Sequence, residues 1–136
     1  MPDLTGRKGY QKASPVRDEE SRKEWASSKQ QRCQACWHKP DWRGLAVHHL
    51  VRGFRSDEPT NWLLFCGQCH DLCHDGAIRV NGVLLPKLTL GICASIKLAE
   101  DPDEFDLDRL VALFGRPIEL EPIPEFLLAE RKVRLR

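Results

Sequence analysis

Two short cysteine pairs constrain this chain more than any other feature of its sequence. CQAC (Cys33 and Cys36) and CGQC (Cys66 and Cys69) are separated by 29 residues. Each pair can present two thiolates to one ion from a tight turn, and four thiolates in a tetrahedral array suit zinc. The sequence therefore predicts a structural zinc site with a closed coordination shell. In so small a core, the metal should supply much of the folding energy.

The other two cysteines are assigned by their spacing. Cys73 lies four residues after Cys69, so it could replace Cys69 as a zinc ligand if a helix there were rotated. The CxxC spacing favours Cys69. Cys93 falls on the apolar face of TLGICASIKLA, where a thiol is most simply a small core residue.

Length and composition indicate one domain with a modest core, since the chain has 136 residues and a hydrophobic share of 41%. No apolar run approaches the roughly 20 residues that span a bilayer. The opening MPDLTGRKGYQKASP also lacks the apolar segment of a signal peptide. We therefore expect a cytoplasmic protein with no membrane partner, in which six cysteines serve as metal thiolates rather than disulfides.

Charge is distributed unevenly along the chain. Residues 1–56 carry twelve Lys or Arg against six acids, and residues 57–136 carry nine against fourteen. Residues 1–56 are therefore a candidate binding surface for an anionic polymer. The alternative is that these charges lie on solvent-exposed faces of helices. We predict a flexible basic arm over 1–16, a zinc-stabilised core over 17–85, and a helical C-terminal extension of the same domain over 86–136.

The hydrophobic patterns predict an α+β fold. Strand, polar loop, strand and helix follow one another through the cysteine and histidine motifs, and Asn81 and Gly82 mark a hairpin turn after them. Trp25 is the expected core anchor of a helix near the N-terminus. The predicted ranges are a helix at 15–31, strands at 44–51 and 61–65, a helix from about residue 67, a hairpin at 77–85, and helices at 89–99, 106–114 and 124–136.

Four of the five histidines form a second constellation: His48, His49, His70 and His74. Imidazoles at i and i+4 on a helix, with one more from a facing strand, make a three-ligand set that leaves coordination positions open. The remaining imidazole, with a pKa near neutrality, suits a general base. Adjacent strand residues point to opposite faces, so His48 and His49 can both serve only at a strand end or bulge.

These residues resemble the HNH nuclease family, whose fold is the ββα-metal motif. The resemblance runs through CQAC, VHHL, Asn61 and CGQCHDLCH, over about residues 33–75. The four-cysteine zinc variety of that family has its catalytic loop between the two CxxC pairs, as this chain does. The implied fold is a ββα-metal core with a structural four-cysteine zinc site, flanked by an N-terminal helix and a C-terminal hairpin with helices.

The resemblance also implies a role for each matching residue. His49 corresponds to the histidine that activates water, and Asn61 to the residue that braces the loop and orients that base. His48, His70 and His74 correspond to the ligands of a catalytic divalent metal. His48 stands where Asp is commoner, and an all-imidazole site favours zinc, nickel, cobalt or manganese over magnesium. If His74 pointed away, the two-ligand site would be more magnesium-like.

The implied activity is metal-dependent hydrolysis of DNA phosphodiester bonds with 5′-phosphate and 3′-hydroxyl products. Arg52 and Arg55 are candidate phosphate contacts, with a solvated loop face as the alternative reading. Small free-standing proteins of this kind occur in phages and bacteria. Three roles stay open for residues 86–136: an added packing layer, homodimerisation or selection of the target. Two rivals stay open: a non-catalytic zinc module that binds nucleic acid or protein, and another metallohydrolase that uses a three-histidine site.

Overall fold

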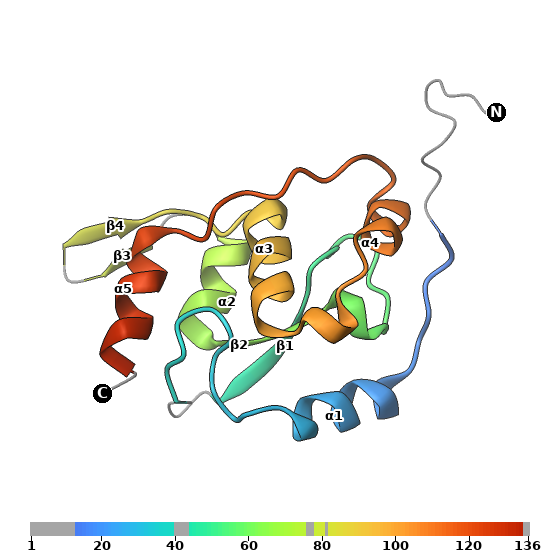
Figure 1. Ribbon diagram of the computed structural model, residues 1–136, viewed down its shortest axis with the longest axis horizontal. Helices are drawn as coiled ribbons and strands as arrows, with labels where there is room; N and C mark the ends of the chain where they lie inside the picture. The colour runs from blue at the N-terminus through green and yellow to red at the C-terminus, as the bar shows by residue number, and fades with distance from the viewer. Residues whose placement is uncertain (1–12, 40–43, 76–77, 81, 135–136) are drawn as a thin grey trace.

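The computed structural model describes residues 13–39, 44–75, 78–80 and 82–134. Within these ranges it contains five α-helices, two short 3-10 helices and two separate two-stranded antiparallel sheets (Figure 1), which confirms the predicted α+β class. In chain order the elements are α1 (Glu19–Ser28), β1 (Leu45–His49), η1 (Pro59–Asn61), β2 (Trp62–Cys66), α2 (Gly67–His74), β3 (Ile78–Val80), β4 (Val83–Leu85), α3 (Leu90–Glu100), η2 (Pro102–Glu104), α4 (Leu107–Phe114) and α5 (Glu125–Arg134).

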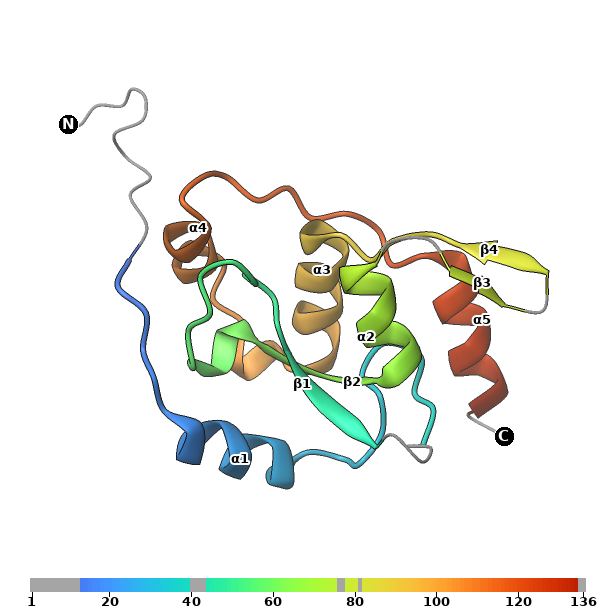
Figure 2. The same ribbon diagram turned by 180° about the vertical axis from the view of Figure 1, so that it is seen from behind.

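The β1–β2 hairpin lies between α1 and the pair formed by α2 and α3 (Figures 1 and 2). Its register pairs His48 with Leu63 and His49 with Trp62. Trp62 packs against Trp25 of α1, with ring centroids 5.4 Å apart. Leu63 belongs instead to the main core, which α2 and α3 help to form. Both faces of β2 are therefore covered, and this explains its continuous apolar sequence WLLF.

The main core extends from the cysteine pairs to the C-terminal helices. Its fully buried side chains include Leu72 of α2, Ile96 of α3, Leu110 of α4 and Leu127 of α5. Residues 86–134, the described part of the C-terminal region, thus share one hydrophobic core with the segment that carries the motifs.

Side-chain caps set several helix boundaries. Asp18, Thr89 and Asp106 each accept a backbone N–H from the first turn of the helix that follows. Gly115, with a φ of 89°, ends α4 in the left-handed conformation that glycine adopts without strain. Because Asp18 is its N-cap and Ser28 its last residue, α1 is shorter than predicted and has no basic residue in its last turn.

A buried polar cluster ties α1 to α3. Trp25 Nε1 donates to Asp101 at 3.1 Å, and the same carboxylate accepts from Lys97 at 2.6 Å and from Lys29 at 2.8 Å. Burial lowers the pKa of Lys97 to about 8, although its hydrogen bond to Asp101 acts in the opposite direction. The predicted role of Trp25 as a core anchor is confirmed, and the anchor holds α1 against the hairpin.

Two predictions fall partly outside the described residues: most of the basic arm (1–16) and Asn81 of the hairpin turn. The predicted hairpin itself is present, because β3 pairs with β4. At the described end of the arm, the Ala13 N–H donates to the Ala112 carbonyl at 3.1 Å, so this residue is attached to the core. No helix in the described part of the chain is long and apolar enough to cross a membrane.

Candidate metal centre and active site

The four cysteines of the CxxC pairs form one compact cluster. Their Sγ atoms all lie within 4.8 Å of one another, and all four residues are buried. The Sγ atoms of Cys36 and Cys66 are 3.9 Å apart. Zinc with Zn–S bonds of about 2.3 Å would hold neighbouring sulfurs about 3.8 Å apart in a tetrahedron. The cluster is therefore compatible with a structural zinc, and Cys69 rather than Cys73 is its fourth member.

Hydrogen bonds hold the first CxxC pair next to the second. The Trp37 N–H donates to the Cys33 carbonyl at 2.9 Å and closes a tight turn, in which Trp37 has a φ of 64°. Gln34 fastens the turn to the hairpin, since its N–H donates to the Leu64 carbonyl at 2.7 Å and its Oε1 accepts from the Leu64 N–H at 2.8 Å. The second pair begins at Cys66, the N-cap residue of α2. The fold therefore assembles the cluster from one tight turn, the end of β2 and the first turn of α2.

Arg131 of α5 covers the first cysteine pair. Its Nε donates to the Ala35 carbonyl at 2.7 Å and its Nη2 to the Gln34 carbonyl at 3.0 Å. Burial lowers the pKa of Arg131, whereas Glu100 and the neighbouring thiols act in the opposite direction. The guanidinium thus places a positive charge beside the cluster, which complements the net negative charge of four thiolates around one zinc ion.

Three histidines form a second cluster on the other side of α2. The Nε2 atoms of His70 and His74 lie 3.1 Å apart, and the His48 ring centroid is 5.4 Å from that of His70 and 5.7 Å from that of His74. One ligand nitrogen from each lies within 4.8 Å of the others. Metal–nitrogen bonds of about 2.0–2.1 Å place neighbouring nitrogens about 3.0–3.4 Å apart, so the arrangement fits a metal ion.

Burial favours the neutral form of the His48 imidazole. His48 stacks on Phe65 and is 2% exposed. Its burial, followed by the neighbouring His70 and His74, lowers its pKa to about 3, and the pKa values of His70 and His74 are also lowered, first by burial. His48 Nδ1 is buried, and no residue that the structure describes forms a hydrogen bond with it. A neutral ring with a free nitrogen is the form of histidine that binds metal.

His48 and His49 occupy the last two positions of β1, as the strand-end condition requires. Both line a cavity of about 400 Å³, together with His70 and His74 from α2. The cavity also contacts the loop that follows β1, including Gly53. The structure thus brings all four predicted histidines to one open space, although adjacent strand side chains diverge.

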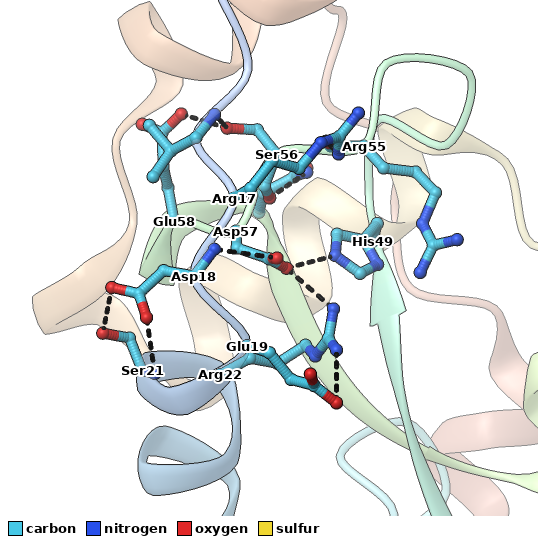
Figure 3. Close-up of polar contacts among 12 residues, drawn as sticks. Arg17, Asp18, Glu19, Ser21, Arg22, His49, Arg55, Ser56, Asp57 and Glu58 are labelled. Carbon is cyan, nitrogen blue, oxygen red and sulfur yellow. Dashed lines mark hydrogen bonds and ion pairs between the residues drawn. The ribbon is translucent and has the colours of Figure 1, made fainter.

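His49 binds a carboxylate rather than the histidine cluster. Its Nε2 lies 2.9 Å from Asp57 Oδ1, and both residues are buried (Figure 3). Burial lowers the pKa of His49, and the hydrogen bond to Asp57 opposes that change. The effect of burial is the larger one, so the pKa of His49 lies below the near-neutral value that the sequence suggested and the neutral ring is favoured. With the proton on Nε2 facing Asp57, Nδ1 is the basic nitrogen.

Asp57 is itself held by the start of the first helix. Arg22 Nη1 donates to Asp57 Oδ1 at 3.0 Å, and the Asp18 N–H donates to Asp57 Oδ2 at 3.2 Å (Figure 3). Burial raises the pKa of Asp57, but its hydrogen bonds and Arg22 outweigh that effect and leave the pKa below its ordinary value. The carboxylate is therefore ionised and fixed in orientation by groups from a distant part of the chain.

Asn61 fastens both ends of the loop between the strands. Its Oδ1 accepts from the Val51 N–H at 2.8 Å, and its Nδ2 donates to the Ser56 carbonyl at 3.0 Å. Its backbone carbonyl accepts from the Leu50 N–H at 2.9 Å. This fully buried amide fixes the loop next to His49 and Asp57, with each side-chain group satisfied as burial requires.

Arg52 and Arg55 both line the histidine cavity and are exposed. Arg52 Nη1 donates to the Cys73 carbonyl at 2.6 Å, which anchors it to the end of α2. The backbone carbonyl of Arg55 accepts a hydrogen bond from the Arg17 side chain (Figure 3). Two guanidinium groups thus stand at the cavity, in reach of an anion that enters it.

Sequence reasoning missed Asp57 and the placement of the last two cysteines. The acidic loop sequence SDE, eight residues after His49, was the available signal for a histidine partner. Cys73 and Cys93 are each buried, and their Sγ atoms lie 3.7 Å apart. No local spacing indicates that pair, because it joins α2 to α3 across 20 residues.

Comparisons with protein families, with curated proteins and with solved structures found no match for this chain.

Proposed function

We propose that this chain is a metal-dependent DNA endonuclease of the HNH type, with a ββα-metal core formed by β1, β2 and α2. One observation carries the proposal. Three metal-competent imidazoles and a fourth, carboxylate-bound imidazole line the same open cavity. A structural metal site has a closed coordination shell and needs no base beside it. Three ligands leave coordination positions open for water and substrate, and a nearby base is what catalysis requires.

His49 is the general base in this proposal. The ring nitrogen that does not face Asp57 accepts a proton from a water molecule, and this water attacks phosphorus in line. Asp57 holds the ring in one tautomer and stabilises the positive charge that forms on it. Asn61 keeps the loop that carries Asp57 in place through its bonds to Val51 and Ser56.

His48, His70 and His74 are the proposed ligands of the catalytic ion. A divalent metal held by them would neutralise charge on the phosphate and at the leaving 3′ oxygen. His74 turns toward His70 rather than away from it, which favours the three-ligand arrangement. Three imidazoles prefer manganese, cobalt, nickel or zinc to magnesium.

Arg52 and Arg55 are the proposed contacts for DNA phosphates. Both are exposed at the cavity, where a scissile phosphate must bind to reach His49. Fork-shaped guanidinium groups suit bidentate contact with phosphate oxygens. The expected products carry 5′-phosphate and 3′-hydroxyl ends, as the family resemblance implies.

The test is plasmid cleavage by protein that retains its structural zinc, with manganese, cobalt, nickel, zinc or magnesium added in turn. We expect His49→Ala to lower the cleavage rate by roughly 10²- to 10⁴-fold with at least one ion. His38→Ala is the matched control, because the fifth histidine is exposed and does not line the cavity. A folded protein that binds DNA but cuts none, with any of these ions, would support the non-catalytic zinc module instead.

A further inference from the structure

The two cysteines outside the CxxC cluster form a close, buried pair. Cys73 of α2 and Cys93 of α3 are each 1% exposed, and their Sγ atoms lie 3.7 Å apart. The Cys36 and Cys66 Sγ atoms within the zinc cluster are 3.9 Å apart. Both separations match the sulfur spacing of about 3.8 Å around a tetrahedral zinc ion.

A third ligand completes the set. One ring nitrogen of His48 lies within 4.8 Å of both Sγ atoms, and His48 is 2% exposed. Its Nδ1 is buried and has no hydrogen-bond partner among the described residues, although buried polar atoms normally have one. A buried imidazole with an unpartnered ring nitrogen, beside two buried thiols, is a pattern that a bound metal ion explains.

We propose that Cys73, Cys93 and His48 form a further metal site that binds a thiophilic ion such as Zn²⁺ or Cu⁺. Two thiolates and one imidazole favour such thiophilic ions, whereas three imidazoles also accept nickel, cobalt and manganese. A cavity of about 440 Å³ is lined by all three residues, so a water molecule or small ligand can occupy a fourth position. Arg52 and Lys87 line the same cavity and supply positive charge beside the two thiolates.

The site shares one residue with the histidine cluster. His48 belongs both to the group with His70 and His74 and to the group with Cys73 and Cys93. An ion bound to one group through a given nitrogen removes that nitrogen from the other group. The two sites therefore compete unless the ring bridges two ions through Nδ1 and Nε2.

The experiment counts thiophilic ions bound to fully reduced protein that carries one zinc ion per chain, at the four-cysteine cluster. Cd²⁺ is added without oxygen, and native mass spectrometry and the thiolate-to-metal absorption report how many ions bind. We expect His70→Ala and the parent protein to bind the additional Cd²⁺, and Cys93→Ser to lose it. Ni²⁺ binding to the histidine cluster should show the reverse pattern, lost in His70→Ala and kept in Cys93→Ser. His48→Ala should lose both.

Exchange of Cd²⁺ into the four-cysteine cluster would occur equally in every variant, so the difference between variants isolates the additional site. Circular dichroism and retained zinc establish that Cys93→Ser is folded. Equal Cd²⁺ stoichiometry in the parent protein and Cys93→Ser would overturn the site and leave two thiols packed in the core. A purified protein lighter by two hydrogens, with Cys73 joined to Cys93, would overturn it in favour of a disulfide. None of these readouts depends on DNA cleavage.

Discussion

The cysteine cluster and the histidine cluster draw ligands from the same helix but differ in exposure. Cys69 of α2 faces the core and is fully buried, whereas the next residue, His70, is partly exposed and His74 is exposed. Consecutive helical residues are about 100° apart around the axis, so one short helix supplies both clusters. One face of α2 therefore contributes to the buried cysteine cluster, and the neighbouring face contributes to the open histidine cluster.

This difference predicts different consequences of losing each site. A closed four-thiolate site has no position for substrate and contributes to folding. The open histidine site contributes to stability only through the few contacts that its rings make. Three experiments test how far the cysteine cluster and the histidine cluster differ in what they contribute.

The largest expected effect is loss of folding when the cysteine cluster is broken. Structural zinc contributes roughly 10–16 kcal/mol in small domains, which is comparable with the whole net stability of roughly 5–15 kcal/mol. Cys36→Ser should therefore abolish the cooperative unfolding transition seen by circular dichroism, whereas His70→Ala should shift it by about 1 kcal/mol or less. Zinc content should fall only in Cys36→Ser. A folded, zinc-free Cys36→Ser with parental stability would remove the distinction between the two sites.

An intermediate effect is expected at His49, the proposed base beside the open site. Asp57→Asn removes the negative charge next to His49 Nε2, so an imidazolium formed in the proposed proton transfer would lose its stabilisation. We expect kcat for DNA cleavage to fall roughly 10- to 100-fold with little change in KM. Asp57→Glu should recover part of the loss. Asp108→Asn, an exposed acid in the first turn of α4, is the control. An equal loss in Asp57→Asn and Asp108→Asn would mean that Asp57 does not act through His49.

The smallest expected effect is a pH dependence of stability that arises from the histidine cluster. Burial lowers the pKa of His48 to about 3 in the folded state, against about 6.5 in the unfolded chain. Between these values the unfolded chain binds more protons, so the free energy of unfolding decreases as pH falls from 6.5 toward 3. The slope due to His48 is at most about 1.4 kcal/mol per pH unit.

Urea unfolding at pH 6.5 and pH 5.0 measures this slope in protein with zinc at the cysteines and no ion at the histidines. His48→Phe keeps an apolar ring against Phe65 and should lose less stability on acidification than the parent protein. His38→Phe changes an exposed histidine and should resemble the parent. Parallel acid dependence in all three proteins would show that His48 is not held neutral by the fold.

Much of the local structure could be predicted because its causes are local. Apolar periodicity indicated the strands that became β1 and β2, and the helix predicted over 106–114 corresponds to α4. The CxxC spacing identified the four cysteines that cluster, and the i, i+4 spacing placed His70 with His74. The prediction for α1 extended too far because composition alone did not show that Asp18 caps the helix.

The chemistry of the individual rings could not be predicted in the same way. An ordinary pKa was expected for the base, but burial lowers the pKa of His49 and Asp57 partly opposes that effect. Desolvation depends on how much of the chain packs around a group, and this is absent from local spacing. The partner of His49 comes from the loop, and the groups that fix this partner come from α1.

By itself, the sequence determined the ligand types, their spacing and the order of strand, loop, strand and helix that carries them. The tertiary structure alone decided which side chains meet across long separations: Cys73 with Cys93, His49 with Asp57, and Asp57 with Arg22. Spacing along a strand or helix follows from backbone geometry, which every chain shares. Contacts between elements depend on how the whole core packs, and that packing places His48 between two groups of possible metal ligands.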